Sequence, residues 1–121
     1  MTDRHLSEIV TGIAGTLRPI FQKYGVRQAI LFGSLATGDA TPRSDVDLIV
    51  TMDTEKSFFE RYEGILAEIT LAIDRRHVDL LIYTPAELER MRDRPFVRRA
   101  LEEGVIIYES QEANARQPRK P

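Results

Sequence analysis

The chain has 121 residues, of which 42% are hydrophobic and 30% charged, a composition typical of a globular protein with one hydrophobic core. The formal net charge of −2 is too close to neutral, and of the wrong sign, for a protein that binds long nucleic acid through its phosphates. The absence of cysteine excludes disulfides and thiolate metal sites. A polar N-terminus, and no apolar run near the ~20 residues of a membrane span, predict a soluble cytoplasmic protein.

The first third of the chain predicts a helix, a strand and a loop. Apolar residues recur every three or four positions over Leu6–Tyr24, which predicts a helix that Pro19 should kink or restart and that Gly25 should end. The short apolar segment Gln28–Phe32 predicts a buried strand. The segment Ala36–Ser44, rich in small polar residues, predicts a loop.

The middle of the chain predicts two strands joined by a helix. Asp45–Met52 alternates, with Val46, Leu48 and Val50 on one face and Asp45, Asp47, Ile49 and Thr51 on the other. Helical spacing returns over Glu55–Ile73. A second alternating strand is predicted over Val78–Tyr83, with Asp79 on the face opposite its neighbours.

The last third predicts helices and a final strand. Thr84–Glu87 has the form of a capping box, the following helical region should break near Pro95 and end at Gly104, and Val105–Tyr108 should form a strand. The order of elements indicates an α+β fold with a small mixed sheet covered by helices.

Two units follow from this order. We expect residues 1–109 to form one domain, and residues 110–121 to be a disordered tail because they lack apolar anchors.

Three carboxylates are candidates for a metal site. Asp45 and Asp47 leave the same face of one strand, although aspartate is also common at strand ends. Asp79 lies within another strand, where it would be costly unless bound to a metal or paired with one of three arginines, Arg43, Arg75 or Arg76. Converging within ~4–5 Å, the carboxylates would repel by roughly 3–4 kcal/mol per pair, which cations would offset. Oxygen-only ligands favour two Mg²⁺ ions, or Mn²⁺.

Gly33-Ser34 follows the first predicted strand. Such a pair usually marks a turn, but a glycine also lets a phosphate approach the backbone amides and the serine hydroxyl.

With these residues placed, the stretch LFGSLATGDATPRSDVDLIV resembles the signature of the polymerase-beta-like nucleotidyltransferases. Gly33-Ser34, the ten residues Leu35–Ser44 and Asp45-Val46-Asp47 match its spacing, and Asp79 in HVDLLIY fills the place of the third carboxylate. The segments FQKYGVRQAILFGS and ALEEGVIIYE are similar to the minimal nucleotidyltransferase (MNT) subfamily. The resemblance covers roughly residues 15–109 and implies the polymerase-beta-like fold.

The resemblance implies a role for each matched residue. Asp45 and Asp47 would bind both ions, Asp79 would complete the shell of one ion and help to take the acceptor proton, and Gly33 and Ser34 would hold the outer phosphates. The donor would be ATP, attacked at its α-phosphorus with release of pyrophosphate.

One position departs from the family. Thr37 stands where an arginine is common, and Arg43 and Ser44 are further candidates for nucleotide contacts.

The MNT resemblance also implies a partner, a HEPN-domain ribonuclease toxin, with this chain as its antitoxin. AMP would be transferred to a tyrosine hydroxyl of the toxin. Two alternatives stay open: a non-catalytic antitoxin that neutralises its partner by binding, and a nucleotidyltransferase that acts on a small molecule or RNA.

Overall fold

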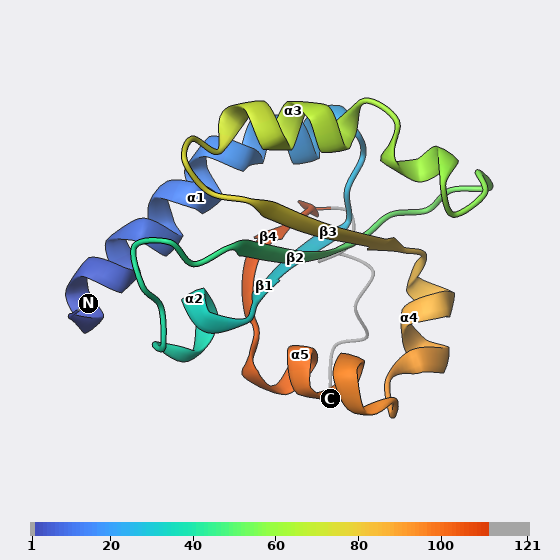
Figure 1. Ribbon diagram of the computed structural model, residues 1–121. Coiled ribbons are helices and arrows are strands. Elements are labelled where there is room, and N and C mark those ends of the chain that lie inside the picture. The colour runs from blue at the N-terminus through green and yellow to red at the C-terminus, as the bar shows by residue number, and fades with distance from the viewer. Residues whose placement is uncertain (1, 112–121) are drawn as a thin grey trace.

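The computed structural model describes residues 2–111 and places four strands in one sheet, in the order β3-β2-β1-β4 (Figure 1). The elements along the chain are α1 (Asp3–Lys23), β1 (Gln28–Phe32), α2 (Ser34–Thr37), β2 (Val46–Thr51), the 3₁₀ turn η1 (Glu60–Tyr62), α3 (Ile65–Ala72), β3 (Val78–Tyr83), α4 (Pro85–Met91), α5 (Pro95–Glu103) and β4 (Val105–Glu109). The α+β fold with a small mixed sheet is therefore confirmed.

The sheet is mixed because of its connections. The strand β1 pairs antiparallel with both β2 and β4, whereas β2 and β3 are parallel. A parallel pair needs a long crossover, and the segment with η1 and α3 supplies it. The starts of β2 and β3 therefore lie at the same edge of the sheet.

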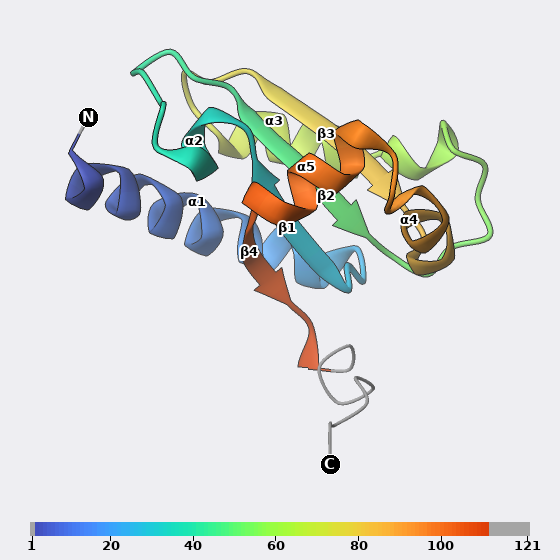
Figure 2. The ribbon, with the colours of Figure 1, turned by 90° about the horizontal axis from the view of Figure 1, so that it is seen from below.

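Helices cover both faces of the sheet. The helices α1 and α3 lie on one face and α4 and α5 on the other (Figures 1 and 2). Alternate strand residues point to the two layers, as predicted. The α1–α3 layer buries the larger cluster, which includes Leu17, Phe21, Leu31, Leu48, Ile65, Ile69 and Ile82. The smaller cluster on the α5 face contains Ile30, Ile49 and Ala100.

The helix α1 is longer than predicted and does not restart at Pro19. It runs unbroken from Asp3 to Lys23, with the Thr2 hydroxyl accepting from the His5 amide as its N-cap. Leu17 and Phe21 flank the proline and are both fully buried. Their packing on the sheet offsets the loss of one helical hydrogen bond.

The helix predicted over Glu55–Ile73 forms only in its second half. Residues 52–59 are irregular, and α3 begins after Gly64, which has a φ of +80°. A Cβ at Gly64 would lie 2.6 Å from the hydroxyl of Tyr24, which is hydrogen-bonded to Glu68. The prediction was wrong because Phe58 joins an aromatic cluster with Tyr62 and does not continue the helical stripe.

The final strand forms where it was predicted, with one further residue, Glu109. The expected tail lies mostly outside the described residues.

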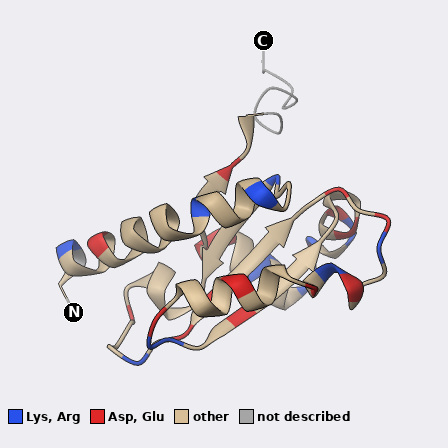
Figure 3. Ribbon diagram, turned by 90° about the horizontal axis from the view of Figure 1, so that it is seen from above, with Lys and Arg blue, Asp and Glu red and all other residues tan. Residues whose placement is uncertain are grey.

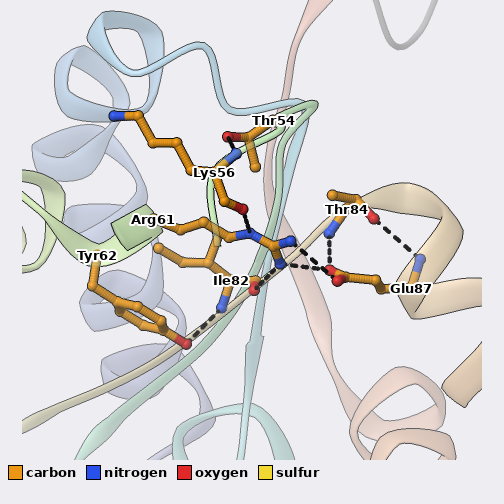
Figure 4. Close-up of polar contacts among 7 residues, drawn as sticks. All are labelled: Thr54, Lys56, Arg61, Tyr62, Ile82, Thr84 and Glu87. Carbon is orange, nitrogen blue, oxygen red and sulfur yellow. Dashed lines mark hydrogen bonds and ion pairs between the residues drawn. The ribbon is translucent and has the colours of Figure 1, made fainter. Parts of the chain in front are cut away.

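A buried guanidinium joins the irregular crossover to α4 (Figure 4). The side chain of Arg61 is 8% exposed. Its Nη2 donates to Oε2 of Glu87 at 3.1 Å. Its Nη1 donates to the Ile82 carbonyl at 3.4 Å, and its Nε donates to the Lys56 carbonyl at 3.1 Å. Glu87 also closes the predicted capping box with Thr84. These contacts with Arg61, followed by those with Thr84, hold the pKa of Glu87 at about 2, below its ordinary 4.5.

We expect Arg61→Ala to lower the free energy of unfolding by about 2 kcal/mol, because Glu87 and two carbonyls lose one buried donor. Urea denaturation at pH 7 measures this loss. The control is Arg98→Ala, whose pair with Glu102 is exposed on both sides and should contribute about 0.5 kcal/mol or less. Because the pKa of Glu87 is lowered, its contribution is complete above pH 4.5 and disappears as the pH falls through about 2. Equal losses for both variants would contradict the assignment.

Charges are mixed over the α1–α3 side of the molecule. Lysines and arginines are interspersed there with aspartates and glutamates (Figure 3). Within residues 2–111, none of the helices has the length and apolarity that crossing a bilayer would require.

Candidate active site

Three carboxylates meet at the edge where β2 and β3 begin. Asp47 and Asp79 are partners in the parallel register, and Asp45 immediately precedes β2. One oxygen from each carboxylate lies within 4.8 Å of the others. Because Asp47 alternates with Val46 and Leu48 of the larger cluster, its side chain lies on the α5 face. The predicted convergence of the three aspartates on two adjacent strands is present.

The cluster repels a further negative charge. Burial raises the pKa of the half-buried Asp47 to about 6, aided by a hydrogen bond with Asp79 and by the charges of Asp79 and Asp45. An ionised set of three carboxylates therefore calls for a counter-charge, and its donors are all oxygen. These are the ligands that Mg²⁺ and Mn²⁺ prefer, so the residues fit the divalent ions that the sequence suggests.

The position of Asp79 differs in one respect from the expectation. Its side chain is 56% exposed, so it is not a buried carboxylate that must be paired to be tolerated. The more buried carboxylate is that of Asp47, which lies between Asp79 on β3 and Phe32 on β1.

The arginine partners suggested for Asp79 contact other groups. Nη1 of Arg76 donates to the Ser44 carbonyl at 2.7 Å, and Nε of Arg75 lies 3.6 Å from Asp74. Besides its hydrogen bond with Asp47, Asp79 contacts His77, whose Nε2 is 3.2 Å from Oδ1. His77 immediately precedes β3, and the sequence signal for it was its spacing of two residues from Asp79.

Gly33 borders the carboxylates directly. A Cβ at this position would lie 2.2 Å from Oδ2 of Asp47, and the backbone has φ +76° and ψ −159°, a region that is essentially restricted to glycine. The glycine thus makes room for an aspartate as well as for any phosphate. Ser34 follows as the first residue of α2, whose last two residues, Ala36 and Thr37, lie in the segment predicted as a loop.

The remaining candidates lie in the turn before Asp45. The Ser44 hydroxyl accepts from the Thr41 amide at 2.8 Å, and the Arg43 amide donates to the Thr41 hydroxyl at 3.2 Å. The Arg43 side chain is exposed. Through these contacts both residues stabilise the turn that precedes Asp45 and positions it in the cluster.

A cleft of about 370 Å³ lies between α2 and α5 and has Gly33 in its wall. Its walls carry Phe32, Gly33, Ser34, Thr37, Asp39, Phe96, Arg99, Ala100 and Glu103. The end of α5 packs tightly on β1, since a Cβ at Gly104 would lie 2.6 Å from Cγ2 of Ile30. The α5 wall could not be predicted from the sequence, because nothing in the spacing of Phe96 relates it to Gly33.

A larger cavity, of about 620 Å³, lies between α1, α2 and β4 and is lined mainly by apolar side chains such as Leu6, Val10 and Ile106. None of the three aspartates lines it. The smaller cleft is the one that shares Gly33 and Ser34 with the carboxylate edge.

A mixed sheet carrying a Gly-Ser turn and three converging carboxylates defines the nucleotidyltransferase class. The nucleotidyltransferase domain family matches residues 15–112, so the chain belongs to that family and is a nucleotidyltransferase. It is also 33% identical over 103 residues to "Putative protein adenylyltransferase MJ1379" of Methanocaldococcus jannaschii, covering 84% of this chain and 95% of the relative. The family resemblance seen in the sequence is confirmed.

Solved structures support the fold. A chain in the crystal structure of a toxin-antitoxin with AMP-PNP superposes with a TM-score of 0.59 at 19% identity, over 84% of this chain and 77% of that one. A chain of a mutant toxin-antitoxin MntA-HpeT gives a TM-score of 0.58 at 17% identity, with the same coverage. At these identities the likeness concerns the fold alone.

Proposed function

We propose that this nucleotidyltransferase transfers AMP from ATP to a tyrosine hydroxyl of a HEPN-domain toxin and so acts as its antitoxin. The observation that carries the proposal is the convergence of Asp45, Asp47 and Asp79 beside Gly33 and Ser34. The name of the Methanocaldococcus relative supports adenylylation of a protein, and the toxin-antitoxin with AMP-PNP supports both the nucleotide and the kind of partner.

The proposed roles follow from position. Asp45 and Asp47 would hold two divalent ions, with Asp79 completing the shell of one of them. When bound, Mg²⁺ or Mn²⁺ supplies charge neutralisation and polarises the phosphate oxygens. Gly33 leaves the backbone open to the outer phosphates, and Ser34 offers its hydroxyl.

Asp79 is an exposed group that could take the acceptor proton. A partner can reach its carboxylate, and the contact with His77 orients it. The acceptor oxygen forms a bond to the α-phosphorus, the bond to pyrophosphate breaks, and the hydroxyl proton passes to an Oδ atom of Asp79. The acceptor itself must be presented by another molecule.

Labelling with two forms of ATP tests the proposal. The chain is incubated with Mg²⁺, the HEPN-domain protein encoded beside it, and ATP radiolabelled at either the α- or the γ-phosphate. We expect protein-bound label from the α-position only, mapped by mass spectrometry to a tyrosine as one or more AMP groups. Label on RNA or on a small molecule, and none on the partner, would instead support a nucleotidyltransferase that acts on those acceptors. Label from the γ-position would indicate phosphorylation and contradict the proposal.

One observation favours the non-catalytic alternative. Thr37, which stands where the family often has arginine, donates its hydroxyl to Asp39 at 3.1 Å, so this wall of the cleft carries a carboxylate. Neutralisation of the toxin by Asp45→Asn plus Asp47→Asn at wild-type level would show that binding alone suffices.

A further inference from the structure

We propose that the nucleoside of the donor nucleotide lies in the cleft between α2 and α5, with its base stacked on Phe96. This inference rests on the proposed function and adds a binding residue that the sequence signature does not contain. It starts from the position of the cleft, which shares Gly33 and Ser34 with the carboxylate edge.

One stripe of α5 forms the far wall. Phe96, Arg99 and Glu103 are spaced by three and four residues, so they project from the same side of the helix. The buried residues Val97 and Ala100 hold α5 on the sheet, which fixes this stripe opposite α2. The distance between the two walls is therefore set by the core.

Phe96 presents an aromatic surface to the cleft. Its ring meets Phe32 edge to face, with centroids 5.6 Å apart at 89°, yet 57% of Phe96 stays exposed. Phe32 is the strand partner of Asp47, so the aromatic pair is anchored next to the carboxylates. An exposed aromatic ring in the wall of a cleft is the kind of surface on which a nucleobase stacks.

The carboxylates of the cleft can accept hydrogen bonds from a ribose. Nε of Arg99 lies 3.2 Å from Glu103, which pairs these two charges, and Asp39 adds a further carboxylate. Ribose hydroxyls can donate to these carboxylates, while the outer phosphates lie at Gly33 and Ser34 as proposed above. A volume of about 370 Å³ is within the range of small-molecule sites.

Calorimetry with two ligands tests the assignment. ATP and inorganic tripolyphosphate are titrated in the presence of Mg²⁺ into the wild-type chain and into Phe96→Ala. We expect Phe96→Ala to weaken ATP binding by about 5- to 100-fold, because one base–aromatic stack is lost. Tripolyphosphate has no base, so its affinity should not change. Phe96→Tyr keeps the ring and should bind ATP as the wild type does.

The matched control is Phe59→Ala. Phe59 is 88% exposed and packs against Phe58 in the irregular crossover, outside the cleft, so its loss should affect neither ligand. Thermal unfolding of each variant verifies folding. An equal loss of both ligands in Phe96→Ala would make Phe96 a structural support of the cleft and overturn the proposal. Unchanged ATP affinity together with impaired transfer would also overturn the proposal, because the acceptor, and not the base, would then bind at Phe96. Failure of the wild type to bind ATP would overturn the proposed function as well.

Discussion

Asp47→Asn should reduce nucleotidyl transfer by a factor of at least about 100 while making the metal-free protein more stable. The substitution removes one proposed ion ligand, and stabilisation of the reacting phosphate is lost with it. It also removes the most strongly disfavoured charge of the cluster. Transfer is measured with radiolabelled ATP, and stability by urea denaturation in EDTA.

The dependence of the free energy of unfolding on pH has a direction that follows from the pKa of Asp47. The pKa of Asp47 is about 6 in the folded chain against an ordinary 3.8, so the folded state holds the proton more tightly. The stability that this provides is complete below pH 3.8 and is lost as the pH rises through 6. Since Asp47 is partly open to solvent, we expect a loss of about 1–2 kcal/mol, less than the full shift would give. The difference between wild type and Asp47→Asn isolates this contribution.

Asp74→Asn is the matched control. Asp74 is exposed and pairs with Arg75, so the same change there should alter neither transfer nor the pH profile. Adding Mg²⁺ should raise the melting temperature of the wild type and of Asp74→Asn, but not that of Asp47→Asn. If Asp47→Asn instead unfolds the metal-free chain by several kcal/mol, Asp47 is a structural residue and the proposed ion site is wrong.

Gly33→Ala should be the second severe substitution, with an expected loss of transfer of about 100-fold or more. The added methyl would overlap Oδ2 of Asp47, so the carboxylate must move, and the backbone conformation becomes strained by about 1–3 kcal/mol. Transfer, the melting temperature and the shift of that temperature with Mg²⁺ are the three measurements.

Gly25→Ala separates strain from crowding. Gly25 also has a positive φ, +69°, but a Cβ there would have no atom within 4 Å. We expect it to lose about 1–2 kcal/mol of stability and to keep both transfer and the response to Mg²⁺. Equal loss of function in the two variants would mean that strain alone, and not displacement of Asp47, explains the effect of Gly33→Ala.

The sequence predicted those parts of the site that are encoded by spacing within one strand. Asp45 and Asp47 share a face because they are two residues apart, and the alternation of β3 put Asp79 on the corresponding face. The alternation excludes a slip of one residue, which would turn the apolar face of β3 to solvent, but the register that sets Asp47 beside Asp79 is a property of the assembled sheet.

Contacts between distant segments were not predictable in this way. The α5 wall of the cleft depends on how Gly104 packs against Ile30, and the irregular crossover depends on Arg61 reaching Glu87. Helical spacing over Glu55–Ile73 was misleading because several of its apolar residues serve an aromatic cluster. Local periodicity reports which side is buried and does not say which neighbour buries it.

The parallel pairing of β2 with β3 also limits how the chain can vary in length. Asp79 follows the turn after α3 by only a few residues, and side chains alternate along β3. An insertion that shifted β3 by one residue against β2 would place Val78 or Leu80 beside Asp47 and turn the Asp79 carboxylate toward the buried layer under α1 and α3. Insertions are tolerable in the turn before the strand, but within the strand the register is as strict a requirement as the identity of the acid.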